Sequence, residues 1–129
     1  MKKKKNSLYP PDWIKMARKD WQRLNIMLRE GDAEGAGYFL QQSLEKYLKA
    51  FLLQQGWALK KIHNLYTLLE DAVKYQPVLE SFRELCEHVS GYYLTERYPE
   101  LTPSELTCED IKKDLKEAEK FIRMLFPEE

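Results

Sequence analysis

The stretch AGYFLQQSLEKYLKAFLLQQG, residues 36–56, decides the fold. Placed on a helix at about 100° per residue, it brings Leu40, Leu44 and Phe51 onto one stripe. Other apolar side chains spread round the edges of this stripe: Phe39, Leu48, Ala50 and Leu52. A helix that is apolar over most of its circumference must be covered on several sides, so we expect the central helix of a bundle. Gly56 is well placed to end it in the left-handed conformation.

A narrow polar wedge interrupts this apolar surface. Its members are Gln41, Gln42, Glu45, Lys46 and Lys49. A solvated face between neighbouring helices explains the wedge, and a polar contact strip for a partner is the alternative.

Helical periodicity recurs on both sides of the central stretch. A first helix begins at Pro11, with Asp12 as its cap, and Asp32 can cap the central helix. Three more helices are expected, from His63 or Asn64 to about Tyr75, from about Val78 to Tyr93, and from Glu109 or Asp110 to Pro127. The inward stripe of the helix that begins near Val78 is Val78, Phe82, Leu85, Val89 and Tyr92.

The segment LTERYPELTPSEL, residues 94–106, contains two prolines and is expected to be an irregular loop. No stretch shows the period-two alternation of a strand. The sequence therefore predicts an all-α fold, a bundle of four or five helices connected mostly as up-and-down hairpins.

The length of 129 residues favours one domain. We expect residues 1–10 to be a flexible basic tail and residues 11–129 to form a single helical domain. No apolar run approaches the roughly 18 residues that a membrane span needs, and no hydrophobic segment follows Lys2–Lys5 as in a signal peptide. A cytoplasmic protein without membrane contact is the expectation.

The charge balance argues against a protein that coats nucleic acid. Without Lys2–Lys5, 17 basic and 21 acidic residues remain, a net charge of −4. Such a balance leaves room only for a small local basic site. The lysines themselves are expected to aid solubility, with contact to RNA or an acidic partner as the alternative.

Known catalytic and cofactor motifs are absent from the sequence. We find no glycine-rich phosphate loop, no HExxH zinc helix, no dinucleotide fingerprint and no nucleophile elbow. Cys86 and Cys108 are widely spaced and are expected to be reduced thiols. We therefore expect no metal and no cofactor.

One segment, residues 82–100, gathers side chains that suit a chemical site. His88 can move protons near neutral pH, and Arg83 and Arg97 can hold phosphate. Tyrosines that can stack on bases accompany them: Tyr92, Tyr93 and Tyr98. On a straight helix, however, Arg83 and His88 stand about 140° apart, so a helix break or a second subunit would have to bring them together.

Packing alone is the competing interpretation of this segment. In that case Tyr92 is a core residue and His88 is a surface residue near Glu84. His63 and Asn64, at a helix start, are similarly expected to cap the helix and hold the incoming linker.

Three pieces of the sequence, taken in order, resemble the HEPN family of small helical domains. The first is a (Q)Q-x-x-EK-x-(L)KA run on the second helix, here Gln41, Gln42, Glu45, Lys46, Lys49 and Ala50. A His-x-Leu segment follows, here His63 and Leu65. The third piece is a Tyr-Tyr…Arg-Tyr-Pro segment, here Tyr92, Tyr93, Arg97, Tyr98 and Pro99.

The resemblance implies a helical bundle that is usually a dimer. It implies a partner, a minimal nucleotidyltransferase, in a toxin–antitoxin or abortive-infection pair. Many members are metal-independent RNases that use an Arg followed after four to six residues by a His, a spacing matched by Arg83 and His88. Here Glu84 follows the Arg where the nucleases commonly have Asn, and Ser90 stands where they often have Tyr.

Three functions follow from these observations. The first is a nucleotide- or RNA-binding module, a dimer with a nucleotidyltransferase partner, that uses Tyr92, Tyr93, Arg97, Tyr98 and Lys46. The second is an RNase toxin in which His88 moves the proton and Arg83 stabilises the charged phosphorane. The third is a helical adaptor in which every feature is packing.

Overall fold

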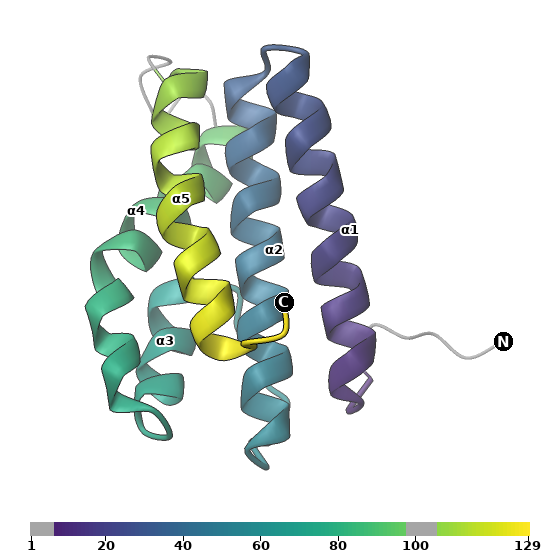
Figure 1. Cartoon of the computed structure of the whole chain (residues 1–129), viewed down its shortest axis with the longest axis vertical. Coiled ribbons are helices and arrows are strands. Elements are labelled where there is room, and N and C mark those ends of the chain that lie inside the picture. The colour runs from purple at the N-terminus through teal and green to yellow at the C-terminus, as the bar shows by residue number, and fades with distance from the viewer. Residues whose placement is uncertain (1–6, 98–105) are drawn as a thin grey trace, which may run out of the picture.

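The computed structural model describes residues 7–97 and 106–129 (Figure 1). Its elements are α1 (Pro10–Arg29), α2 (Ala33–Gln54), α3 (Leu65–Val73), the 3₁₀ helix η1 (Pro77–Phe82), α4 (Arg83–Arg97) and α5 (Cys108–Leu125). The described residues contain no strand, which confirms the predicted all-α bundle. None of the described helices combines the length and the apolar character that a membrane crossing requires.

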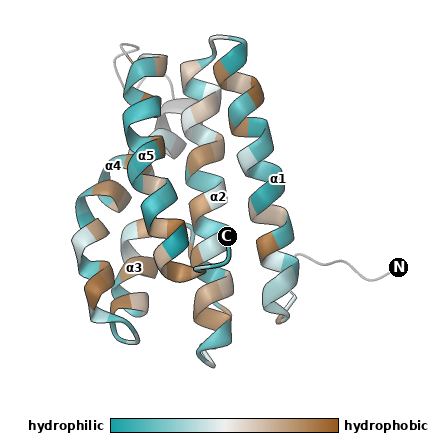
Figure 2. Ribbon diagram, viewed as in Figure 1, coloured by the Kyte–Doolittle hydropathy of each residue, from teal (hydrophilic) through white to brown (hydrophobic). Residues whose placement is uncertain are grey.

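Helix α2 is the central helix, as predicted. It contacts α1, α3, α4 and α5, and 15 of its 22 residues are buried. Figure 1 shows α1 along one side of it and α3 and α4 on the other, with α5 in front. Helices α1 and α5 alternate between polar and apolar residues along their length, because each covers α2 with one face only (Figure 2).

Two glycines with positive φ end the first two helices. Gly56 has φ +89°, and the Trp57 amide donates to the Leu52 carbonyl at 3.0 Å, so the predicted left-handed cap is confirmed. Gly31, with φ +76°, ends α1 in the same way. Asp32 then caps α2, since its carboxylate accepts from the Gly35 amide at 2.8 Å.

The start of α1 differs from the prediction. Pro10 is its first residue, and Tyr9 occupies the cap position without a side-chain hydrogen bond. Asp12 lies within the first turn and accepts a hydrogen bond from Ser7 Oγ at 2.7 Å, so its predicted capping role was wrong.

The segment before and through α4 also differs. Residues 77–82 form a 3₁₀ turn, in which residues three apart share a face, so Leu79 and Phe82 are buried while Val78 is 52% exposed. The prediction that Val78 faces inward was therefore wrong. Helix α4 continues to Arg97, so the first four residues of the expected loop are helical instead.

The segment after α5 returns to the central helix. Phe126 is buried, and its ring centroid lies 6.3 Å from that of Tyr47 and 6.5 Å from that of Phe51. This contact brings the last residues of the chain against α1 and α2.

Candidate functional site

Arg83 is the first residue of α4 and is directed toward α3 and η1. Its guanidinium forms two hydrogen bonds with the Glu80 carboxylate, one of them 2.7 Å long, and lies 3.8 Å from Glu70. It also stacks over the Tyr66 ring, 4.8 Å from the centroid. The hydrogen bonding with Glu80 raises the pKa of Arg83 and lowers the pKa of Glu80. An anionic ligand would have to compete with these carboxylates for Arg83.

His88 lies one and a half turns further along α4 and is directed toward α5. Its Nδ1 is 3.3 Å from the Asp114 carboxylate, and its Nε2 is 3.4 Å from the Tyr92 hydroxyl. Tyr92 donates a hydrogen bond to the same carboxylate. Since the His88 side chain is 59% exposed, this is an accessible imidazole that a carboxylate and a phenol hold in place.

Tyr92 is itself a core residue. It is 4% exposed, and its ring packs against Gly37 of α2. Burial raises its pKa well above the ordinary value, and the hydrogen bond to Asp114 adds to the shift, so the hydroxyl stays protonated and donates. The ring therefore has no open face for a base, and it contacts His88 through its hydroxyl and through a tilted ring contact, with the two ring centroids 5.3 Å apart.

The space beside His88 is acidic. A pocket of about 250 Å³ is lined by Ser81, Glu84, Leu85, His88, Asp114 and Glu117. Three of these residues are carboxylates, which repel phosphate. Among the described residues, no group of three or more His, Cys, Asp and Glu side chains is arranged to hold a metal ion.

The remaining predicted site residues belong to the last turns of α4, to α2, or to the segment outside the residues that the structure describes. Tyr93 and Arg97 belong to the last turns of α4, and Tyr98 and Pro99 lie outside the described residues. Lys46 pairs with Asp20 of α1, a residue that is 1% exposed and also accepts from Arg23 at 2.7 Å. The structure thus directs Lys46 to α1, Arg83 to α3 and η1, and His88 to α5.

The polar wedge of α2 is largely interior, contrary to the expectation of a solvated face. Glu45 and Lys49 pair at 2.9 Å with side chains that are 5% and 4% exposed. His63 Nδ1 lies 2.9 Å from the same Glu45 carboxylate, and the buried Gln41 amide donates to the His63 carbonyl at 2.8 Å. Because the linker after α2 folds over these residues, it supplies partners that helical periodicity does not reveal.

Sequence reasoning also missed Asp114. It lies 26 residues after His88, on the polar side of α5, and looks like any other surface carboxylate. Only the packing of α4 against α5 makes it a partner of His88 and Tyr92. Similarly, Asn64 was one of two candidates for the cap of α3, and the structure selects it, since its side chain accepts from the Tyr66 amide at 2.8 Å.

Comparisons with known proteins agree with this fold. A family model described as the HEPN domain matches residues 11–128. The chain is similar to the crystal structure of TT1696 from Thermus thermophilus, with 26% identity and a TM-score of 0.80, over 90% of this chain and 94% of that chain. No curated protein matches the sequence.

Proposed function

Because the chain belongs to the HEPN domain family, we propose that it is a nucleotide- or RNA-binding module that acts as a dimer and pairs with a minimal nucleotidyltransferase. The pairing would be of the toxin–antitoxin type. In this proposal the chain recognises its ligand and partner but does not itself cleave RNA.

The separation of Arg83 from His88 is the observation that favours binding over cleavage. Metal-independent cleavage needs one group to take the proton of the 2′-hydroxyl and a cation beside the same phosphate. In one chain, Arg83 is held by Glu80 and Glu70, whereas His88 is held by Asp114 on the other flank of α4. No single phosphate of an RNA strand can meet both groups while these pairs persist.

We place the ligand contact on the last turns of α4. Tyr93 and Arg97 are four residues apart within the helix, so their backbone positions lie on one face. A tyrosine and an arginine on one face suit a base and its phosphate. Tyr98 extends this set in the sequence.

Binding is tested with the purified chain and a labelled single-stranded RNA in EDTA. We expect a saturable complex that weakens with salt and is lost in Arg97→Ala, while Lys112→Ala, an exposed charge on α5, leaves it unchanged. Size-exclusion chromatography with light scattering tests the dimer, and co-purification with a nucleotidyltransferase encoded in a neighbouring reading frame tests the pairing. If RNA, nucleotides and such a nucleotidyltransferase all fail to bind, the chain is a structural adaptor.

An RNase is the second candidate, and the contact between His88 and Asp114 favours it. A carboxylate on Nδ1 fixes the orientation of the imidazole, as a general base requires. His88 would take the 2′-hydroxyl proton, the 2′-oxygen would attack phosphorus as the bond from phosphorus to the 5′-oxygen breaks, and the 5′-oxygen would leave with a proton from water. Arg83 of a second copy would then have to stand beside the phosphate.

The same RNA incubation separates the two candidates. Cleavage that survives EDTA and disappears in both His88→Ala and Arg83→Ala supports the RNase. Intact RNA in a stable complex supports the binding module. Cleavage that persists in His88→Ala excludes His88 as the base.

A further inference from the structure

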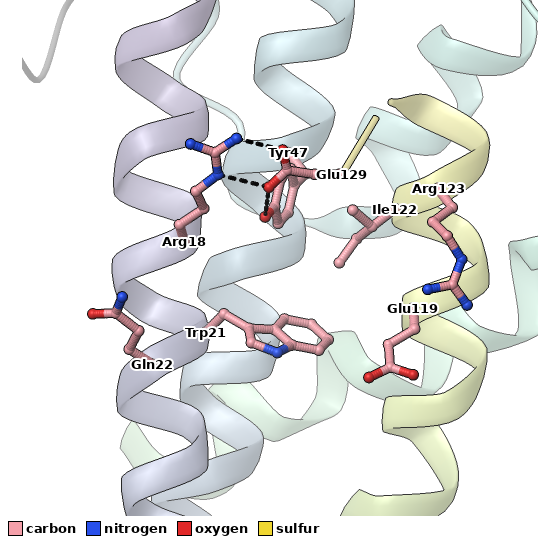
Figure 3. Close-up of a pocket in the computed structure, with 8 residues that line it drawn as sticks. All are labelled: Arg18, Trp21, Gln22, Tyr47, Glu119, Ile122, Arg123 and Glu129. Atoms are coloured by element: carbon pink, nitrogen blue, oxygen red, sulfur yellow. Dashed lines mark hydrogen bonds and ion pairs between the residues drawn. The ribbon is translucent and has the colours of Figure 1, made fainter. Parts of the chain in front are cut away.

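A second pocket lies between α1, α2, α5 and the segment after α5 (Figure 3). Its volume is about 360 Å³, and it is lined by Arg18, Trp21, Gln22, Tyr47, Glu119, Ile122, Arg123 and Glu129. At about 100° per residue, Arg123 stands half a turn round α5 from Asp114, so this pocket and the His88 pocket lie on opposite faces of that helix. We propose that it binds a guanine nucleoside monophosphate, either free or as a nucleotide of an RNA strand.

On one wall of the pocket, the polar side chains already bond to one another. Arg18 holds the Glu129 carboxylate through two hydrogen bonds, of 2.7 and 2.5 Å, and the Tyr47 hydroxyl donates to Glu129 at 2.9 Å. Figure 3 shows these three side chains meeting above Trp21. Their charges cancel, so this wall shapes the pocket but offers no cation to a ligand.

The opposite wall holds the charges that remain. Within the part of the chain that the structure describes, neither Arg123 nor Glu119 forms an ion pair or a hydrogen bond through its side chain. A guanidinium whose N–H donors are available binds phosphate through paired hydrogen bonds. Arg123 is therefore the phosphate-binding group of the pocket.

An aromatic floor lies below these charges. Trp21 is half-buried, and Figure 3 shows its indole extending from α1 into the space between α1 and α5. A flat base can stack on such a ring. The pocket volume falls in the range of small-ligand sites.

In this proposal Glu119 selects guanine among the nucleic-acid bases. A carboxylate only accepts hydrogen bonds, and guanine alone presents two adjacent donors, N1–H and the 2-amino group, on its Watson–Crick edge. Glu119 precedes Arg123 by four residues on α5, so the two side chains reach the pocket from one face. They can hold the base edge and the phosphate of the same ligand.

This inference rests on the proposed function for its ligand class but places the ligand on another surface. The test is a titration of the full chain with GMP, followed through the indole N–H signal of Trp21, which Trp21→Phe identifies. We expect saturable binding. Arg123→Gln and Glu119→Gln should each weaken the binding of GMP about tenfold. Lys120→Gln, an exposed change on the same helix, should bind GMP like the wild type.

The ligand series tests the chemistry. Guanosine and inorganic phosphate should each bind at least about tenfold more weakly than GMP, and AMP should bind more weakly because adenine offers only its amino group. A short RNA with one guanine distinguishes a nucleotide within a strand from a free one.

Two results would overturn the inference and leave the proposed function standing. One is the absence of GMP binding up to about 10 mM in a protein that still binds RNA through Arg97. The other is GMP binding that Arg97→Ala removes and Arg123→Gln does not. If neither nucleotides nor RNA bind at all, both proposals fail.

Discussion

The ring of Tyr92 lies so close to Gly37 that a Cβ atom on residue 37 would stand 2.9 Å from its Cγ atom. Gly37 belongs to α2 and Tyr92 to α4, and the Tyr92 hydroxyl reaches Asp114 on α5. The missing side chain at Gly37 therefore sets the depth at which Tyr92 sits. It also sets where Asp114 and His88 meet.

Gly37→Ala should destabilise the fold even though alanine favours helix. The helix propensity gain is about 1 kcal/mol, but an added methyl against a ring that is 4% exposed has the character of overpacking, which costs about 1–3 kcal/mol. Because this cost outweighs the gain, we expect the free energy of unfolding to fall by up to about 2 kcal/mol in urea denaturation followed by circular dichroism.

Gly91→Ala is the matched control for this change. Gly91 also lies within a helix, but a Cβ atom there meets nothing within 4 Å. We expect stability to rise by up to about 1 kcal/mol. If both alanine variants are equally stabilised, the close approach of Tyr92 to α2 does not constrain the fold.

Glu45→Gln should be among the most destabilising single changes on α2. It leaves Lys49 charged and buried with its carboxylate partner removed, a loss of about 3–5 kcal/mol. Glu117→Gln is the control, because Glu117 pairs with Lys120 at the surface with side chains 50% and 67% exposed, and about 0.5 kcal/mol or less is expected.

A double variant sharpens the test of the buried pair. The double variant Glu45→Gln/Lys49→Met removes both charges. Its loss of stability should be smaller than the sum of the losses of the two single variants. Additive losses in chemical denaturation would mean that Glu45 and Lys49 do not depend on one another.

The fold could be predicted from the sequence because its signals are local. The apolar periodicity of residues 36–56 reports the environment of α2 on every side, and a glycine at position 56 reports a left-handed turn whatever packs against it. The 3₁₀ turn at Pro77 could not be predicted in the same way. A period of 3.6 residues per turn placed Val78 inward, whereas in the tighter 3₁₀ turn Leu79 is buried and Val78 is exposed.

The candidate site could be predicted only in part, because the sequence does not reveal which residue a charged side chain pairs with. Arg83 and His88 were correctly placed on different flanks of one helix, since helix geometry alone decides that. Glu45 and Lys49 look like solvated residues until the linker that carries His63 covers them. The contacts of Asp114 with His88 and of Glu129 with Arg18 join distant segments, and no pattern in either segment indicates them.

Glu129 should contribute stability that depends on pH. Hydrogen bonding with Arg18, and then with Tyr47, lowers the pKa of Glu129 in the folded chain below its ordinary value of 4.5. A carboxyl with a lowered folded pKa stabilises the fold above the unfolded value and loses that contribution as the pH falls through the folded value. Glu129→Gln should thus lower stability by about 0.5–1 kcal/mol at pH 7, since Arg18 is 60% exposed, and by much less well below pH 4.

The measurement is the free energy of unfolding of Glu129→Gln relative to the wild type from pH 3 to 7. Glu128→Gln makes the same chemical change at the exposed neighbouring residue and should show no such trend. A difference that stays constant with pH would exclude the carboxylate of Glu129 as its source.

The two cysteines should differ sharply in reactivity. Cys86 is 0% exposed in the core, and burial raises the pKa of its thiol to about 12, so little thiolate exists at pH 8. Cys108 is the first residue of α5 and is partly exposed.

In a native protein treated with a thiol-specific chromogenic disulfide, we expect one rapid reaction that Cys108→Ser removes. The second thiol should react only as fast as the bundle opens, and urea should accelerate it. Two rapid reactions in the absence of urea would mean that the packing of α4 against α2 exposes Cys86 far more often than the structure indicates.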